Sequence, residues 1–198
     1  MKDFAGRIAV VTGGGTGMGR ELVRQLVAEG CNVAMCDVFA HTMAETRRLC
    51  ESERLPQGLR ITTHIADVSD EAQVQRFRHE VAERQDTDKI HLLFNNAGVG
   101  GGGSMIADSR DEWEKTFNVC WGGVYHNTRA FLPMLEKADE GHIVNTSATR
   151  SAAFWLSAST SFVLCSTHGM ALPTSMACQG SSPAASVLSL SAISRSAR

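Results

Sequence analysis

The chain has 198 residues, of which 21 are acidic, 19 are Lys or Arg and 43% are hydrophobic, and its formal net charge is −2. This length fits one domain with a substantial core and is too short for two ordinary domains. The near balance of charge, without a long basic run, excludes a surface built to neutralise the phosphates of nucleic acid or anionic lipid.

No stretch of eighteen apolar residues occurs, and no signal-peptide pattern precedes the first strand-like run. We therefore expect a soluble, cytoplasmic chain with no nucleic acid and no membrane as partner. The cysteines form no Cys-x-x-Cys pair, so reduced packing thiols are expected and no metal site is predicted. They are Cys31, Cys36, Cys50, Cys120, Cys165 and Cys178.

Apolar strand-like runs alternate with helical periodicity over the first three quarters of the chain. The predicted strands are Arg7 to Thr12, Asn32 to Asp37, Arg60 to Ile65, His91 to Asn95 and His142 to Ser147. This alternation is typical of repeated βαβ units. It predicts an α/β fold with a doubly wound parallel sheet between two helical layers.

Local residues also predict where three helices begin or end. Gly30 follows the first helix, where a left-handed residue is needed, and Ser69 precedes a helix start. Ser109 and Glu112 have the spacing of a capping box, ahead of a long apolar-periodic helix over residues 109–132.

The composition changes abruptly after Ser147. All 21 acidic residues and all four lysines lie at or before position 140, whereas residues 151–198 contain 13 serines, 9 alanines and two charged residues. Such a segment has too few apolar residues to bury much surface, and we predict at most a short helix in it. The expected organisation is one α/β domain over residues 1–147, followed by a poorly structured or loosely packed tail over residues 148–198.

A glycine-rich segment lies directly between the first strand and the first helix. Its sequence at residues 12–19 is Thr-Gly-Gly-Gly-Thr-Gly-Met-Gly. Glycine permits positive φ and lets a pyrophosphate approach the backbone, while the amino terminus of the helix offers free N–H groups. A merely flexible turn is the alternative, but the flanking strand and helix favour a dinucleotide site. The predicted contacts are Gly13, Gly15, Thr16, Gly17, Met18 and Gly19.

Asp37 ends the second predicted strand, twenty residues beyond Gly17. An acid at this place can accept hydrogen bonds from both hydroxyls of the adenosine ribose. Because a carboxylate there repels a 2′-phosphate, NAD is favoured over NADP. Alternatively, Asp37 only caps the following helix.

These motifs resemble those of the short-chain dehydrogenase/reductase (SDR) family over roughly residues 5–147. The Thr-Gly-x-x-x-Gly-x-Gly pattern at 12–19 is similar to the family's cofactor motif. The Asn-Asn-Ala-Gly run at 95–98 resembles its sheet-stabilising motif, and the Asp-Val pair at 67–68 resembles its adenine contact. The resemblance implies a Rossmann-type sheet of strand order 3-2-1-4-5, incomplete at its carboxyl-terminal part. It adds Asp67, Val68, Asn95, Ala97 and Gly98 to the cofactor site.

The resemblance further implies a nicotinamide-dependent interconversion of secondary alcohols and ketones by an Asn, a Ser, a Tyr and a Lys. Asn118 is then implied to hold a water for proton relay, and Ser147 to orient the substrate oxygen. From the residues alone, Asn118 can equally be a solvated helix residue and Ser147 a strand-end cap.

The Tyr and the Lys have no counterpart. The only tyrosine is Tyr125 and no lysine follows Lys137, whereas the family's Tyr-x-x-x-Lys follows the Ser by a dozen or more residues. A faint match near residue 163 places Val163 and Thr167 at the two positions, and His168 is expected to be a surface residue. Loss of a positioned acid or base typically lowers a rate by about 10²- to 10⁴-fold.

Two functions therefore remain open. One is an oxidoreductase of impaired turnover, and the other is a non-catalytic dinucleotide-binding or vestigial protein. A reading-frame shift would account for the change after Ser147, and restoring the frame in the coding DNA should then recover the missing motif.

A third possibility is an interaction protein, because the apolar helix over 109–132 carries Trp113, Trp121 and Phe131. The resemblance implies that this helix contributes to a homo-oligomer interface. An apolar stripe of this kind can equally be core, and exposed apolar surface can also cause aggregation.

Overall fold

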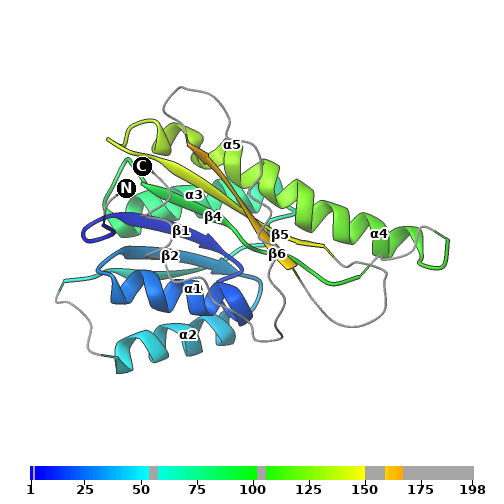
Figure 1. Cartoon of the computed structure of the whole chain (residues 1–198), viewed down its shortest axis with the longest axis horizontal. Helices are drawn as coiled ribbons and strands as arrows, with labels where there is room; N and C mark the ends of the chain where they lie inside the picture. The colour runs from blue at the N-terminus through cyan, green and yellow to red at the C-terminus, as the bar shows by residue number, and fades with distance from the viewer. Residues whose placement is uncertain (2, 54–57, 102–105, 150–158, 167–198) are drawn as a thin grey trace.

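A computed structural model describes residues 1, 3–53, 58–101, 106–149 and 159–166. Its strands form one sheet in the order β3-β2-β1-β4-β5-β6 (Figure 1). The strands are β1 (Ile8–Thr12), β2 (Asn32–Asp37), β3 (Ile61–Ile65), β4 (Leu92–Asn95), β5 (His142–Thr149) and β6 (Ser159–Ser166). The first five run parallel and β6 pairs antiparallel to β5. The predicted parallel sheet and its order over the first five strands are confirmed.

Helices cover both faces of the sheet, as the layered prediction requires (Figure 1). α1 (Gly17–Ala28) and α2 (Ala40–Ser52) pack on one face. α3 (Glu71–Gln85) and α5 (Gly123–Leu135) pack on the other. α4 (Arg110–Phe117) leads into α5 through a π-helical turn, η1 (Asn118–Gly122).

Alternation along the strands produces these two cores. In β1, Ala9 and Val11 face α1 and α2, whereas Val10 faces α3 and α5, and all three are fully buried. Parallel strands covered on both faces read as continuous apolar runs because every side chain is buried. The strands are therefore apolar along their whole length because helices cover both faces of the sheet.

All three predicted helix boundaries are confirmed, and α3 begins at Glu71, two residues after Ser69. Gly30 has φ +82°, and Ser109 and Glu112 form the capping box of α4. α3 is capped by Asp70 and not by Ser69, because the Asp70 carboxylate accepts two N–H groups of the first turn. The Ser69 hydroxyl instead donates to the carboxylate of Asp67 at 2.7 Å.

The structure departs from the sequence prediction at two places. The long helix over 109–132 is interrupted by η1, where a wider turn shifts the faces that the following side chains present. β6 lies where we predicted at most a short helix, since the run Phe-Val-Leu-Cys at 162–165 is rich in strand formers. Arg150 to Ala158 and the chain from Thr167 onward, with His168, lie outside the described residues.

No helix within these described ranges is long and apolar enough to cross a bilayer. The same part of the chain brings together no group of three His, Cys, Asp or Glu side chains that could hold a metal. Cys31, Cys36 and Cys50 are buried free thiols. Burial raises the pKa of Cys36 to about 12, which suits a packing role.

Candidate functional site

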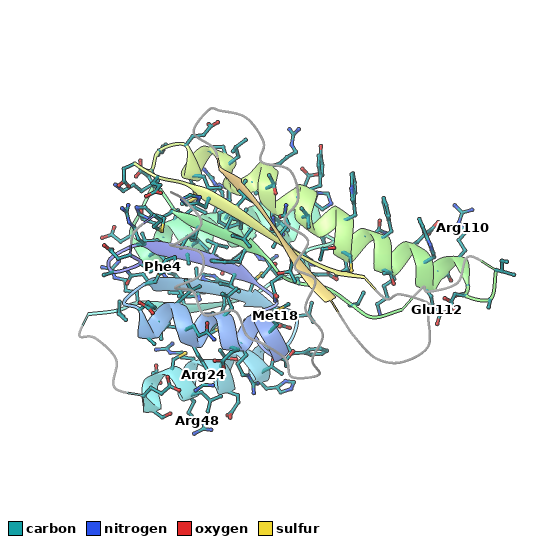
Figure 2. The ribbon with its side chains drawn as sticks, viewed as in Figure 1. Phe4, Met18, Arg24, Arg48, Arg110 and Glu112 are labelled. Atoms are coloured by element: carbon teal, nitrogen blue, oxygen red, sulfur yellow. The ribbon has the colours of Figure 1, made fainter. Side chains whose placement is uncertain are left out.

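The carboxyl ends of β1, β2 and β4 lie at one edge of the sheet, and the loops that follow them form the candidate site. β1 lies between β2 and β4, so the chain leaves β1 at the point where the strand order reverses. Open α/β sheets bind ligands in the crevice at this point. Figure 2 shows Met18, at the start of α1, near this edge, with Phe4 toward the opposite end of the sheet.

The glycine loop after β1 is open where a phosphate would approach. Gly17 has φ +53°, and a Cβ built on it would meet no atom within 4 Å. Thr16 is the residue before α1, and its side chain makes no capping hydrogen bond. The first N–H groups of α1 therefore receive no cap from Thr16 and suit an anion.

Other glycines of this loop are required by close backbone contacts. A Cβ on Gly19 would lie 2.0 Å from the Gly13 carbonyl oxygen and 2.6 Å from Nδ2 of Asn96. A Cβ on Gly13 would lie 2.9 Å from Cα of Ala97, and Gly13 has φ +68°. The loops after β1 and β4 thus pack backbone against backbone.

Thr12 and Asn96 hold these two loops together. The Thr12 hydroxyl oxygen accepts the N–H groups of Asn96 at 2.9 Å and Ala97 at 3.0 Å, and the hydroxyl donates to the Phe94 carbonyl at 3.3 Å. The Asn96 side-chain amide donates to the Thr12 carbonyl at 3.1 Å. Neither side chain was predicted as a site residue. The sequence did offer a signal for both, because Thr12 lies in the motif at 12–19 and Asn96 in the motif at 95–98, each at the end of an apolar strand.

Asp37 contacts the glycine loop directly. Its Oδ2 accepts the N–H of Gly15 at 3.0 Å, and its Oδ1 accepts the N–H of Phe39 at 3.3 Å. Each carboxylate oxygen can accept a second hydrogen bond. The carboxylate is partly exposed, so its geometry fits an additional hydroxyl ligand such as a ribose.

The Asp-Val pair at 67–68 lies in the loop after β3. Asp67 accepts the backbone N–H of Ser69 at 2.9 Å, so part of its carboxylate stabilises its own loop. Val68 is buried, and a Cβ on Gly123 would lie 2.7 Å from its Cγ2. The pair thereby joins the loop after β3 to the start of α5.

Asn95 lies inside the protein and faces away from the open loop. Its amide donates to Oδ1 of Asn145 at 2.8 Å and to the hydroxyl of Thr128 at 3.2 Å. Asn95 therefore connects β4 to β5 and α5, as expected for a sheet-stabilising residue. Among the described residues, its own Oδ1 is buried without a hydrogen-bond partner.

The structure brings Cys120, and not Asn118, to the loop after β4. Cys120 Sγ lies 3.7 Å from the carbonyl oxygen of Val99, and a Cβ on Gly98 would lie 3.7 Å from the same sulfur. Asn118 begins η1 with an exposed side chain. Sequence reasoning placed Cys120 among the packing thiols, because nothing in the sequence reveals a π turn.

Ser147 is exposed near the carboxyl end of β5 and pairs in register with Ser161 of β6. The neighbouring Thr146 hydroxyl donates to Oδ1 of Asn96 at 3.5 Å. The end of β5 is thus linked to the loop after β4, next to the candidate dinucleotide site.

Comparisons with known proteins agree with this arrangement. A family model described as short chain dehydrogenase matches residues 7–161. Meso-2,3-butanediol dehydrogenase of Serratia marcescens is 36% identical over 145 residues, which cover 73% of this chain and 54% of that protein. The chain spans about half the length of the curated relatives it matches.

Two solved structures show the same fold. One is a short chain dehydrogenase/reductase from Burkholderia phymatum in complex with NAD, with a TM-score of 0.65, 35% identity, and coverage of 72% of this chain and 49% of that chain. The other is RhlG of Pseudomonas aeruginosa in a complex with NADP, with a TM-score of 0.60, 28% identity, and coverage of 68% and 50%. Nicotinamide dinucleotides of both kinds are therefore bound by proteins similar to this chain.

Proposed function

This chain belongs to the short chain dehydrogenase family, and from that premise we propose that it is an NAD-binding oxidoreductase whose hydride transfer is impaired. The observation that carries the proposal is the contact between Asp37 and the N–H of Gly15, beside the open Gly17. A carboxylate that could bind the ribose thus lies beside N–H groups without a side-chain cap that could bind the pyrophosphate, which supports the proposal. The proposed nucleotide-binding domain is residues 1–147.

NAD is the proposed cofactor because Asp37 is a carboxylate. A 2′-phosphate on the ribose would bring a second negative charge next to it. The solved relatives include a complex with NAD and a complex with NADP. The proposed preference of this chain for NAD therefore rests on its own residue Asp37. When bound, the nicotinamide would supply the hydride acceptor or donor.

The chain's own residues would bind the dinucleotide and position a substrate. Residues 13–19 would receive the pyrophosphate, and Asp37 the ribose. Ser147 would orient the oxygen of a small secondary alcohol or ketone, a substrate class that the name of the Serratia marcescens relative supports.

No tyrosine is available to exchange the proton with that oxygen. Tyr125, the only tyrosine, stacks on Trp121 with ring centroids 5.8 Å apart and lies under the guanidinium of Arg129. Asn118, which is exposed at the start of η1, is proposed to hold a water for the proton relay. Binding without turnover is therefore the second candidate function, and the stacked Tyr125 favours it.

Isothermal titration of the folded chain with NAD and NADP tests the proposal. Asp37→Ala is expected to weaken NAD binding about tenfold to a hundredfold, since charge-assisted hydrogen bonds contribute about 1.5–3 kcal/mol. Asp37→Asn should bring the affinities for NAD and NADP closer together. Asp88→Ala removes an exposed carboxylate that pairs with Lys137, and it should change neither affinity. A folded parent chain that binds neither dinucleotide would refute the proposal.

We also propose that a second copy of the chain packs on the exposed face of α4, η1 and α5. Four rings at four-residue spacing, here called the aromatic ladder, stack along this face with centroids 5.2 to 5.8 Å apart. They are Trp113, Phe117, Trp121 and Tyr125, and all four are exposed. Part of the ladder lines a shallow groove.

Charged residues flank the aromatic ladder at both ends. Arg110, Asp111 and Glu112 lie at one end, and Arg129 lies at the other.

Trp121→Glu is expected to reduce self-association in sedimentation velocity by about tenfold or more, because it buries a charge in the contact. Phe39→Glu is the matched control, since both side chains are 58% exposed and Phe39 lies on α2's amino end. Equal behaviour of the two variants would contradict an interface on the aromatic ladder.

A further inference from the structure

β3 is the terminal strand of the described sheet, and its sequence makes its free edge prone to pairing with another strand. Residues 61–65 read Ile-Thr-Thr-His-Ile, a run of strand formers without a formal charge. Burial lowers the pKa of His64, so this side chain also stays neutral. Exposed edges of this composition are templates for intermolecular strand addition.

The backbone alternation shows which groups of β3 face outward. The N–H of Val33 donates to the carbonyl of Arg60, and the N–H of Ala66 donates to the carbonyl of Asp37, so residues 60 and 66 face β2. The alternate residues, including Thr63 and Ile65, therefore direct their N–H and C=O groups to the free edge.

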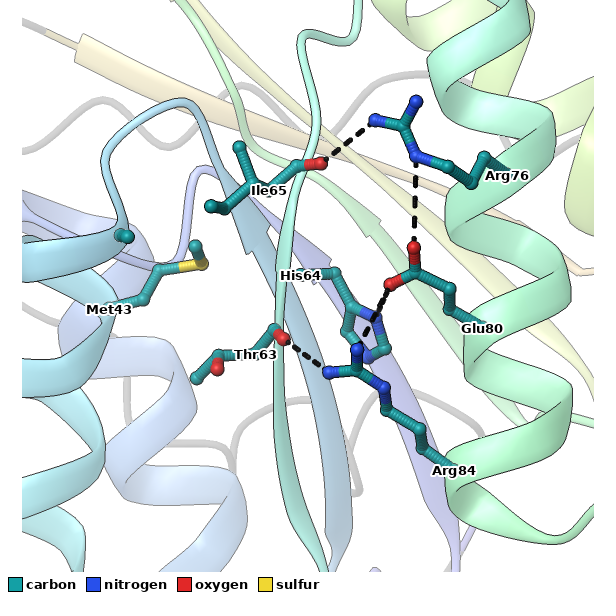
Figure 3. A pocket seen from close by; sticks show the side chains of 8 residues that line it. Met43, Thr63, His64, Ile65, Arg76, Glu80 and Arg84 are labelled. Carbon is teal, nitrogen blue, oxygen red and sulfur yellow. Dashed lines mark hydrogen bonds and ion pairs between the residues drawn. The ribbon is translucent and has the colours of Figure 1, made fainter.

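Two arginines of α3 donate hydrogen bonds to two of the outward carbonyls of β3. Nη1 of Arg84 donates to the Thr63 carbonyl at 3.1 Å, and Nη2 of Arg76 donates to the Ile65 carbonyl at 3.4 Å. Figure 3 shows both side chains extending from α3 to the strand. We refer to Arg76 and Arg84 as the edge arginines.

Glu80 lies between the edge arginines and binds both. Its two carboxylate oxygens each lie 3.7 Å from one guanidinium, and Oε2 is also 2.8 Å from Nδ1 of His64 (Figure 3). The three α3 residues are four apart in sequence, so they share one helix face. The arrangement thus holds both guanidiniums over the strand.

The same side chains line a cavity of about 350 Å³, together with Ala40 and Met43 of α2. Two arginines in a cavity often indicate an anion site. Here Glu80 already supplies the negative charge between them, and a second anion would meet its carboxylate. The arginine side chains that line this cavity are therefore better explained as a cover of the strand edge than as ligand-binding groups.

We propose that Arg76 and Arg84 close the β3 edge against strand addition by a second copy of this chain. An incoming strand must donate its N–H groups to the Thr63 and Ile65 carbonyls, and it would compete there with the guanidinium groups of the edge arginines. The incoming strand must also displace two charged side chains from Glu80. Both requirements make the unpaired edge the more stable state.

The test replaces both edge arginines by methionine, which keeps an unbranched apolar stem and removes the guanidinium donors. Arg47→Met/Arg48→Met on α2 is the matched control, because its arginines are also half or more exposed and each pairs with a glutamate of its own helix. Arg76→Met/Arg84→Met is expected to raise the self-association constant by about tenfold over the control in sedimentation velocity. Association through the aromatic ladder is common to both variants and cancels in the comparison.

Hydrogen exchange locates the new contact. The amides of residues 61–65 should gain protection in the associated form of Arg76→Met/Arg84→Met and remain unchanged in the control. Equal association of the two variants, or association without protection at 61–65, overturns the proposal. If the double variant does not fold, Arg76→Met and Arg84→Met are made singly, and the proposal fails if neither associates more than the control.

Discussion

Replacing Gly19 with alanine is expected to abolish NAD binding and to lower the free energy of unfolding by about 3 kcal/mol, the upper end of ordinary overpacking costs. The added Cβ would lie 2.0 Å from the Gly13 carbonyl oxygen, which belongs to backbone and cannot rotate away. It would also lie 2.6 Å from Nδ2 of Asn96, whose amide joins the two loops. Relief requires the glycine loop to move away from α1, and the proposed pyrophosphate site moves with it.

Titration with NAD and urea unfolding followed by tryptophan fluorescence measure the two effects. Gly100→Ala is the control, because a Cβ at Gly100 meets no atom within 4 Å and the residue lies outside the glycine loop. It should leave both quantities unchanged. If Gly19→Ala binds NAD as the parent does, the close packing at Gly13 is not what shapes the site.

The parallel sheet could be predicted from sequence because burial on both faces leaves a readable pattern. β2, for example, places Val33, Ala34, Met35 and Cys36 in two opposite cores, so the whole run is apolar. β6 could not be predicted in this way. Its pairing with β5 depends on backbone contacts across the fold, and the surrounding Ser- and Ala-rich sequence carries no alternation to reveal it.

The glycines of the loop after β1 were predictable for a different reason. Backbone approach and positive φ demand glycine, so the residue type itself carries the signal, as the close contact at Gly19 shows. Thr12 acts through one hydroxyl that serves three backbone groups, and a threonine at a strand end is common. Only the fold reveals that Asn96 and Ala97 lie within reach of it.

The position of Cys120 could not be predicted because it depends on the irregular turn η1. A regular helix would give residues 118–122 different faces, and sequence periodicity assumes that regularity. The edge arginines were missed for a related reason. Their spacing on α3 is typical of a solvated helix face, and only the sheet order shows that this face borders the free edge of β3.

Turnover by this chain is expected to be about 10²- to 10⁴-fold below that of the Serratia marcescens relative, measured as NADH formation from secondary alcohols under saturating NAD. The proton released with the hydride needs a positioned base beside the substrate oxygen. The family resemblance assigns that role to a tyrosine supported by a lysine, and the chain has neither at the matching positions. In the family the lysine lowers the pKa of that tyrosine from its ordinary value near 10 toward the working range, so both parts of the base are missing here.

Tyr125→Phe tests whether Tyr125 acts as the base in place of the tyrosine that the family has elsewhere. The ring of Tyr125 is held in the aromatic ladder between Trp121 and Arg129, so removing its hydroxyl should leave NAD affinity and any residual turnover unchanged. Ser147→Ala should lower residual turnover further while leaving NAD affinity intact, because Ser147 is proposed to contact the substrate and not the dinucleotide. Turnover equal to that of the relative would contradict the proposed impairment, and a loss of that turnover in Tyr125→Phe would identify Tyr125 as the base.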